Sequence, residues 1–584
     1  MNDTITDEAA YLEHLRALWS EHWPSGVPRE ADYPFGEVPL TEYLREWAHR
    51  QREKPAYIFY GTEITFAQLD ELSDRFAALL SVHNIQRGER IAVFLPTCPQ
   101  FAIVFFGLLK HGCVHVPVNP LFKEHELEYE LQDSGATAIV AQDQLFGMVE
   151  RVWARTTLRV AFTTSVTDML LSTPTLPIPP SIVQPKLACD GALDLLPALE
   201  TVTEVSEPAG VGLDDIAALN YTGGTTGVPK GCIHTQRDML YTAATYCTVA
   251  SQTRPDDVTL CFYPVFWIAG ENMALTFPVF TGTTCVLLAR WDPIAFLTAV
   301  ERHDVTNSAM LVDNVVELMD QPRFHEFDLR SFRKLRVSSF VKKLDVAYRR
   351  RWHALTGVTL IESAWGMTET HTCDTFTSGM QDDEMDLRAQ PVFVGLPVPG
   401  TEFQIRDFVT GELCPLGSEG ELWVRSPSLL RAYWNKPEET TQALRDGWLA
   451  TGDIGLIDAD GYIHYLGRRK EMLKVNGMSV FPTEIEGLLG RHPLVVGSAV
   501  IGRPDPTRGE VPVAFVRLAP EASSSLTESD LTTWCREHMA VYKVPEVRFV
   551  DEFPLTATGK VKKEELLPLL TVHSRGSPPA PMRK

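Results

Sequence analysis

A loop rich in glycine and threonine constrains this chain more than any other feature. The segment YTGGTTGVPKG, residues 221–231, follows an apolar run, Ile216–Leu219, that predicts a buried strand. Glycine lacks the Cβ that would keep backbone N–H groups away from phosphate oxygens, and the threonine hydroxyls and Lys230 add donors and a positive charge. A Walker A loop is excluded, because neither Gly223 nor Gly224 is followed five residues later by the glycine which that pattern requires. We therefore predict a phosphate loop of another kind, since a simple glycine turn would not need these donors.

Length and charge limit the domain count and the partners. A chain of 584 residues is too long for one hydrophobic core, and 44% apolar with 22% charged residues is typical of a globular enzyme. The net charge of −23 argues against a nucleic-acid partner. Ten cysteines without a Cys-x-x-Cys pair predict free thiols in a reducing compartment. The chain shows neither a signal peptide nor eighteen consecutive apolar residues, so we expect a cytoplasmic location and no transmembrane segment.

The N-terminal half alternates between strand and helix patterns. Predicted strands are Arg90–Leu95, Val114–Val118 and Ala136–Ala141, and predicted helices are Gln100–Lys110 and Glu124–Asp133. This alternation favours a largely parallel sheet with helices on its faces.

The C-terminal part changes character near Gly467. Residues 419–425 and 461–466 predict short antiparallel strands, and beyond them lie a helix, two strands and a second helix, predicted at 482–489, 495–501, 511–518 and 531–539. We predict an α/β fold with three parts. They are a large N-terminal domain of layered α/β sheets with a β-rich subdomain (1–469), a small mobile α+β domain (470–572) and a disordered tail (573–584).

Five further motifs follow the loop along the chain. They are YPVFWIAG (263–270), WGMTE (365–369), GWLATGD (447–453), GRRKEMLK (467–474) and LTATGK (555–560). Together with YTGGTTGVPKG they resemble, in order and rough spacing, the adenylate-forming superfamily of acyl-CoA synthetases, peptide-synthetase adenylation domains and luciferases. The resemblance extends from about Thr65 to Leu567. One such motif is a weak signal, whereas six in this order are specific.

The resemblance implies an ATP site. It assigns the grip on the β- and γ-phosphates to Thr222, Gly223, Gly224, Thr225, Thr226, Gly227 and Lys230. It assigns adenine stacking to Trp365, phosphate binding to Thr368, Mg²⁺ to Glu369, and the ribose to Asp453, with Arg468 as its partner at the ribose and phosphate. Gly366, which permits close approach to a ligand, and the apolar Met367 belong to the same nucleotide site. Each has a plainer alternative: glutamate is usually solvated, aspartate in a turn often binds its own backbone, and a lone arginine is usually a surface charge.

Four residues of the small domain receive roles from the same resemblance. Lys470 matches the interdomain hinge, and Lys474 with Gly477 matches the loop that faces the active site for thioester formation. Lys560 is the catalytic lysine of adenylation, joined in catalysis by Thr225 and Glu369. An ammonium group aimed at the α-phosphate would stabilise charge that builds during attack. The alternative is a solvated lysine cluster near the C-terminus.

The chain departs from the family at two places. Residues 335–344, LRVSSFVKKL, contain no glycine where relatives carry a glycine-rich turn, which leaves the adenine contacts of this segment open. Trp267 stands where many relatives have histidine, and either gates the acyl tunnel or packs in the core. The predicted acyl pocket includes Trp267, Ile268, Met273 and Val312, and its segment offers no cation for a second carboxylate.

We therefore predict an ATP-dependent acyl-CoA synthetase, an acid–thiol ligase that uses ATP, Mg²⁺ and coenzyme A. The apolar pocket favours a medium- or long-chain fatty acid, and an aryl acid stays open. Alternatives are an acyl-AMP ligase that loads a carrier protein, a luciferase-like oxidising relative, and a nucleotide- or acyl-binding regulator without catalysis. Retention of Glu369, Asp453 and Lys560 speaks against the last. A homodimer is one expected assembly.

Overall fold

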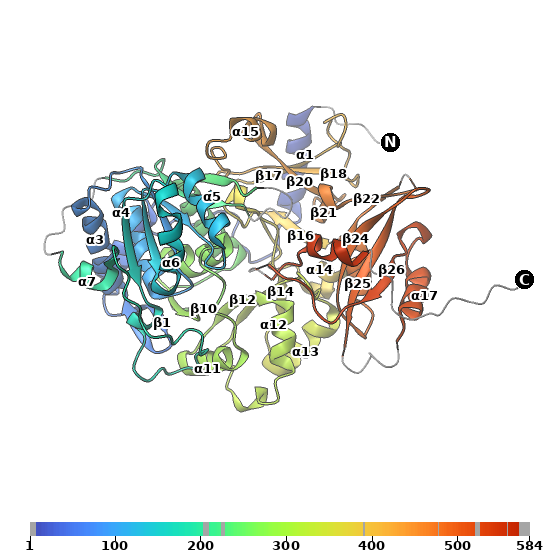
Figure 1. The fold of residues 1–584 in the computed structure, drawn as a ribbon. Coiled ribbons are helices and arrows are strands. Elements are labelled where there is room, and N and C mark those ends of the chain that lie inside the picture. Colours follow the sequence, from blue (N-terminus) through green and yellow to red (C-terminus); the bar gives the residue numbers. More distant parts are fainter. Residues whose placement is uncertain are drawn as a thin grey trace, which may run out of the picture. The chain divides into compact units, whose positions relative to one another are not determined.

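The computed structural model describes residues 7–202, 210–222, 228–388, 392–476, 478–519, 526–556 and 559–570. The chain divides into two compact units (Figure 1). The large unit comprises Met1–Ser339 and Leu344–Tyr465, and the small unit comprises Phe340–Lys343 and Leu466–Lys584.

Two seven-stranded sheets form the framework of the large unit. The first has the order β14-β13-β12-β10-β11-β1-β2 and the second the order β7-β6-β5-β3-β4-β8-β9. Each is parallel except at one edge, where β1 pairs with β2 and β8 pairs with β9 in antiparallel fashion. Strands of the first sheet are β1 (Pro55–Phe59), β2 (Thr62–Thr65), β10 (Val258–Cys261), β11 (Thr284–Leu287), β12 (Asn307–Leu311), β13 (Lys334–Ser338) and β14 (Leu360–Glu362). Strands of the second are β3 (Arg90–Phe94), β4 (Val114–Pro117), β5 (Ala138–Gln142), β6 (Val160–Thr164), β7 (Leu193–Asp194), β8 (Ile216–Tyr221) and β9 (Gly231–Thr235).

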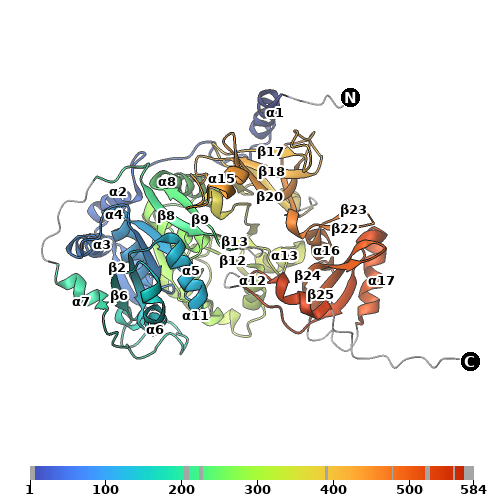
Figure 2. The same cartoon turned by 45° about the horizontal axis from the view of Figure 1, so that its top comes forward.

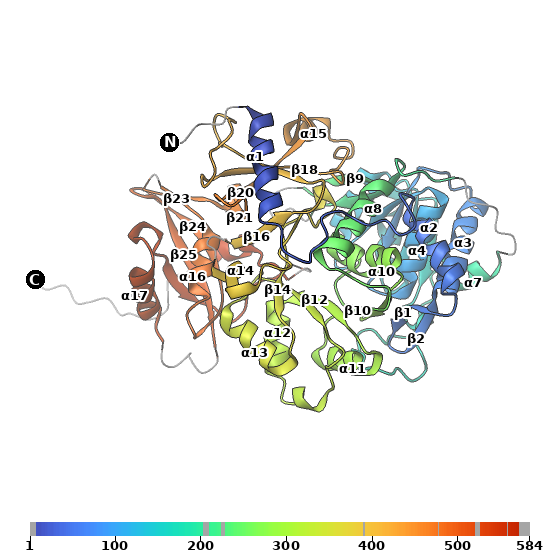
Figure 3. The ribbon, with the colours of Figure 1, turned by 180° about the vertical axis from the view of Figure 1, so that it is seen from behind.

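Helices that are apolar on most faces fill the core of this unit. In α4 (Pro99–His111) every residue from Pro99 to Lys110 is buried, as expected of a helix that is hydrophobic all round. The helix α2 (Leu40–Arg50) contacts α4, α8 (Gln236–Thr245) and α10 (Phe277–Thr281), and all four can be found in Figure 3. The amphipathic helices α5 (Glu124–Ser134) and α6 (Asp143–Val152) cover one face of the second sheet (Figure 2). Further helices of the unit are α1 (Glu8–Glu21), α3 (Phe66–Val82), α7 (Leu195–Glu200), α9 (Ile268–Glu271), α11 (Pro293–His303), α12 (Val312–Met319), α13 (Val346–Thr356), α14 (Met385–Arg388) and α15 (Pro437–Ala443).

Two π-helical turns interrupt the helices that face the first sheet. They are η3 (Tyr246–Ala250), which continues α8, and η4 (Asn272–Thr276), which lies between α9 and α10. Turns of this kind are frequent at functional sites, because the extra residue in the turn re-aims nearby side chains.

A third sheet is antiparallel and gives the large unit its β-rich part. Its order is β15-β16-β21-β20-β18-β17, and β19 pairs with β20. The strands are β15 (Thr375–Phe376), β16 (Val392–Pro397), β17 (Glu402–Arg406), β18 (Gly420–Arg425), β19 (Leu444–Arg445), β20 (Trp448–Ile457) and β21 (Ile463–Arg468).

The small unit has its own sheet and core. The sheet has the order β23-β22-β25-β24, with β26 paired to β25, and α17 packs beside β26 (Figure 1). Its elements are β22 (Leu473–Val475), β23 (Met478–Val480), α16 (Pro482–Leu489), β24 (Val495–Asp505), β25 (Gly509–Leu518), α17 (Glu528–His538), β26 (Glu546–Phe549) and η11 (Lys563–Leu570).

The fold-class prediction is confirmed: an α/β chain with a large N-terminal part, a β-rich portion and a small α+β part. All ten cysteines are free. No helix among the described residues is long and apolar enough to cross a membrane. The predicted boundary at residue 469 and the mobility of the small domain stay predictions, and the tail at 573–584 lies outside the described residues.

Candidate active site

The phosphate loop joins β8 to β9, so its two ends are held side by side by an antiparallel pair. The Thr222 backbone N–H donates to the Lys230 carbonyl at 3.0 Å, and the Lys230 N–H donates to Thr222 Oγ1 at 3.3 Å. These two bonds hold Thr222 and Lys230, at the two ends of the loop, next to each other. Its predicted phosphate ligands Gly223, Gly224, Thr225, Thr226 and Gly227 lie outside the described residues.

Tyr433 joins the end of this loop to the WGMTE motif. The Lys230 ammonium lies 4.1 Å from the centre of the Tyr433 ring, a cation–π contact. The Tyr433 hydroxyl donates to Glu369 Oε1 at 2.9 Å, and the Leu430 N–H donates to the Glu369 carbonyl at 2.8 Å. Two predicted site residues far apart in sequence thus contact the same tyrosine side chain, Lys230 at its ring and Glu369 at its hydroxyl.

The WGMTE segment is a tight turn held against neighbouring backbone. A Cβ on Gly366 would lie 2.4 Å from the Cys373 nitrogen, so the close approach at this position requires glycine. The buried Trp365 ring donates from Nε1 to Asp453 Oδ2 at 2.8 Å. This bond brings together the residues predicted for adenine and ribose, and it occupies one Asp453 oxygen.

Three successive non-glycine residues after this turn have left-handed backbone. His371, Thr372 and Cys373 have φ of 58°, 68° and 63°, a conformation that costs about 1–3 kcal/mol per residue in strain. Hydrogen bonds hold them there: Asn272 Nδ2 donates to the His371 carbonyl at 3.0 Å, and the Thr372 N–H donates to the Met367 carbonyl at 2.9 Å.

A cluster of buried polar side chains contacts the WGMTE segment and the residues that follow it. Glu271 is fully buried, and its carboxylate lies 3.7 Å from His115 Nε2 and 3.6 Å from His371 Nε2 and accepts from Asn220 Nδ2 at 3.0 Å. Burial alone would raise the pKa of Glu271, but the neighbouring His371 and His115 side chains and the Asn220 hydrogen bond hold it below its usual value. His234 Nε2 donates to the Thr368 carbonyl at 2.7 Å.

Glu369 fits a site for one Mg²⁺ shared with substrate phosphates. Magnesium in nucleotide enzymes is held by one or two carboxylates together with phosphate oxygens. The Tyr433 hydroxyl orients one Glu369 oxygen, and the side chain is half-buried at the edge of the turn. Among the described residues, no group of three or more His, Cys, Asp or Glu side chains is arranged to hold a metal without such phosphates.

The small unit carries the other predicted residues at exposed positions. Arg468 ends β21, Lys470 lies in the turn Arg469–Glu471, and Lys474 on β22 donates to Ser479 Oγ at 2.9 Å; Gly477 lies outside the described residues. Two hydrogen bonds join Lys560 to Thr556: the Thr556 N–H donates to the Lys560 carbonyl at 2.7 Å, and the Lys560 N–H donates to Thr556 Oγ1 at 3.0 Å.

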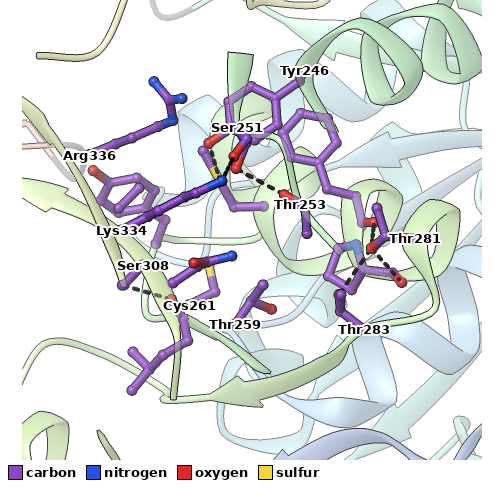
Figure 4. Close-up of a pocket in the computed structure, with 17 residues that line it drawn as sticks. Tyr246, Ser251, Thr253, Thr259, Cys261, Thr281, Thr283, Ser308, Lys334 and Arg336 are labelled. Carbon is purple, nitrogen blue, oxygen red and sulfur yellow. Dashed lines mark hydrogen bonds between the residues drawn. The ribbon is translucent and has the colours of Figure 1, made fainter. Parts of the chain in front are cut away.

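A cavity in the large unit lies between the first sheet and the two π-helical turns (Figure 4). The space among its lining atoms is about 540 Å³, a figure that includes space open to solvent. Tyr246 and Met273, one from each π-helical turn, form part of its apolar wall. Of the four predicted pocket residues, Met273 lines this cavity, whereas Trp267, Ile268 and Val312 are not among its lining residues.

Comparison with known proteins identifies the family. The model of the AMP-binding enzyme family matches residues 44–434, and the model of the AMP-binding enzyme C-terminal domain matches residues 484–560. The chain belongs to the AMP-binding enzyme family. It is 32% identical over 567 residues to a long-chain-fatty-acid–CoA ligase of Bacillus subtilis (strain 168), covering 94% of this chain and 97% of that one. It is 33% identical over 566 residues to the ligase of the same name from Yersinia pestis, covering 94% and 98%.

Solved structures give the same result. An anthranilate CoA ligase in complex with anthranoyl-AMP superimposes with a TM-score of 0.80 at 28% identity, covering 91% of this chain and 97% of that one. The predicted membership of the adenylate-forming superfamily, in its acyl-CoA synthetase branch, is confirmed, and so is the prediction of an acid–thiol ligase that depends on ATP.

Several residues that shape the site of this acyl-CoA synthetase were missed by sequence reasoning. They are Tyr433, His234, Glu271, Asn272 and His371. One signal was available: Glu271 and Asn272 interrupt an otherwise apolar segment directly after YPVFWIAG, and a charged residue in such a segment is buried only with partners.

Proposed function

We propose that this synthetase activates a medium- or long-chain fatty acid and transfers the acyl group to coenzyme A. The observation that carries the proposal is the convergence of Lys230, Tyr433 and Glu369 beside the Trp365–Asp453 pair. Four of them, Lys230, Glu369, Trp365 and Asp453, are residues to which the motifs assign ATP. The similarity to two long-chain-fatty-acid–CoA ligases over nearly the whole chain supports the same substrate class.

In the first half-reaction, a carboxylate oxygen attacks the α-phosphorus of ATP. A bond between that oxygen and phosphorus forms, the bond from the α-phosphorus to the bridging oxygen breaks, and pyrophosphate leaves. Lys230 and the loop residues hold the phosphates that leave, and Lys560 stabilises charge at the reacting phosphate. Mg²⁺, held by Glu369 and the phosphates, would supply further neutralisation of negative charge.

In the second half-reaction, the thiol sulfur of coenzyme A attacks the acyl carbon. A carbon–sulfur bond forms, the bond to AMP breaks, and the thiol proton passes to solvent. We propose that Lys474 and Gly477 belong to the loop used in this step. We also propose that the small domain rotates about Lys470, so that a different face of it is turned to the active site in each half-reaction. The carrier-protein acceptor is the alternative outcome of this step.

Acid-dependent release of pyrophosphate from ATP, measured with and without coenzyme A over a panel of fatty and aryl acids, tests the proposal. Within this panel we expect fatty acids to be better substrates than aryl acids, and acyl-CoA to accumulate. Turnover restricted to aryl acids would contradict the substrate class, and acyl-AMP that accumulates despite coenzyme A would favour the carrier-loading enzyme.

A further inference from the structure

The cavity of Figure 4 has two cationic side chains on its sheet wall. Residues two apart on a strand share a face, and neighbours in register share it too. Lys334 and Arg336 on β13 are in register with Asn307 and Ala309 on β12, and Asn307 is in register with Thr259 on β10. All five line the cavity. The pairing of the strands therefore brings the two cations to one wall.

Arg336 is buried without a carboxylate. Only 7% of the residue is exposed, and one guanidinium nitrogen donates to Ser378 Oγ at 2.7 Å while the group lies 5.6 Å from the Tyr246 ring centre. No ion pair involves Arg336 within the described ranges. A buried cation that lacks a counter-charge is costly, so its retention beside a cavity points to an anionic occupant.

Lys334 adds a second positive charge on the same wall. Its ammonium group donates to the carbonyls of Ser251 at 2.6 Å and Gln252 at 2.9 Å, as the dashed line to Ser251 in Figure 4 marks for the first. Burial and the charge of Arg336 lower the pKa of Lys334 to about 8, which leaves it mainly protonated at neutral pH. The acidic group that acts on it, Asp257, is already bound by Arg333 and by Thr306 Oγ1 at 2.8 Å.

Asn307 supplies an independent sign of a missing polar partner. The residue is 7% exposed, and in the described part of the structure neither polar atom of its side-chain amide has a partner within hydrogen-bonding distance. The Asp257 carboxylate, whose pKa the amide helps to lower, lies beyond that distance. Buried amides are nearly always hydrogen-bonded, and this one lines the cavity beside Lys334.

The opposite wall is apolar and connects to the WGMTE turn. Tyr246, Tyr263, Met273 and Phe277 line it. Next to Met273, the Asn272 amide donates to the His371 carbonyl at 3.0 Å and to Thr372 Oγ1 at 3.1 Å. The cavity thus combines an apolar wall, as a hydrocarbon chain requires, with a cationic wall that a simple fatty acid would leave unpaired.

We propose that this cavity binds the second, non-reacting carboxylate of a dicarboxylic acid, with Arg336 and Lys334 as its cationic partners and Asn307 as a further hydrogen-bond partner. The proposal rests on the proposed function, since the other carboxylate is the one that is adenylated. A long-chain dicarboxylic acid keeps the hydrocarbon chain of the fatty-acid class and supplies the missing counter-charge.

The test compares straight-chain monocarboxylic acids, the dicarboxylic acids of the same carbon number, and the monomethyl esters of those diacids. Pyrophosphate release gives kcat/KM for each, with the diacid value corrected for its two equivalent ends. For the wild type we expect a diacid preference of about ten- to a hundredfold over both matched compounds at the best chain length, as for one charge-assisted hydrogen-bond pair. Equal or better use of the monoacid or of the ester overturns the proposal.

Substitutions of Arg336 and Lys334 test whether these two side chains cause the preference for diacids. In Arg336→Met we expect the ratio of kcat/KM for the diacid to kcat/KM for the monoacid to fall at least tenfold, and in Arg336→Lys to fall less. In Arg351→Met, a control at an exposed site, we expect this ratio to stay as in the wild type. A ratio that Arg336→Met leaves unchanged places recognition elsewhere and overturns the assignment. If Arg336→Met does not fold, the same ratio is compared between Lys334→Met and the wild type. A lower ratio in Lys334→Met supports the assignment, and an unchanged ratio overturns it. Failure of every acid to release pyrophosphate would instead contradict the proposed function.

Discussion

At the scale of single residues, Lys560 separates the two half-reactions. Its backbone is fixed by Thr556, while its side chain is exposed on the small unit, so substitution changes the charge and leaves the fold intact. We expect Lys560→Ala to lower acid-dependent pyrophosphate release by a factor of about a hundred or more and to leave thioester formation from supplied acyl-AMP largely unchanged.

Lys562→Ala is the matched control, because Lys562 is also exposed and forms a surface ion pair with Glu565 at 2.9 Å. We expect it to retain both half-reactions, since exposed ion pairs contribute about 0–1 kcal/mol. If Lys560→Ala lowered adenylation and thioester formation equally, Lys560 would not be specific to adenylation and the prediction would be wrong.

The sequence motifs predicted several residues of the site but did not reveal Tyr433. Lys230, Trp365, Glu369 and Asp453 stand in motifs whose order is visible along the chain. Tyr433, which contacts both Lys230 and Glu369, stands in no such motif. Its contribution depends on a hydroxyl and a ring placed by distant backbone, and no local pattern encodes that placement.

At the scale of elements, α9 shows how close packing positions the site. A Cβ on Gly270 would lie 1.9 Å from the Pro264 carbonyl oxygen, so the start of this helix can approach that carbonyl only with glycine. The helix continues into Glu271 and the π-helical turn that lines the cavity. We expect Gly270→Ala to destabilise the large unit by about 1–3 kcal/mol, measured as a lower denaturant midpoint.

The control for this change is Gly147→Ala in α6. A Cβ there would meet only the ends of flexible side chains, at 3.8 and 3.9 Å. Alanine at that helical position is expected to be neutral or to stabilise by about 0.5–1 kcal/mol. A Gly270→Ala protein as stable as Gly147→Ala would show that the helix moves aside without cost.

At the scale of the whole molecule, the chain has separate hydrophobic cores. Leu531 is fully buried in α17 among residues of the small unit, and Leu109 is fully buried in α4 in the core of the large unit. We expect Leu531→Ala, which removes about 2–5 kcal/mol of packing, to raise amide hydrogen exchange within 466–570 and 340–343 and to leave the large unit unchanged.

Leu109→Ala should give the converse pattern, with faster exchange in the large unit. An equal rise throughout the chain in either variant would mean that the two units unfold as one cooperative body. Two transitions would also make a single unfolding free energy for the whole chain undefined.

The sequence by itself determined the α/β class, the small C-terminal unit and the nucleotide motifs. These depend on local patterns: alternating apolar runs specify strands and helices, and a glycine-rich loop specifies close backbone approach. The tertiary structure alone decided which side chains meet. Lys334 and Arg336 look like surface cations in the sequence, and the pairing of β13 with β12 places them at a cavity beside Asn307, with Arg336 buried and Lys334 half-buried. Strand register and burial are set by contacts between distant segments, so the charge of that wall follows only from the folded chain.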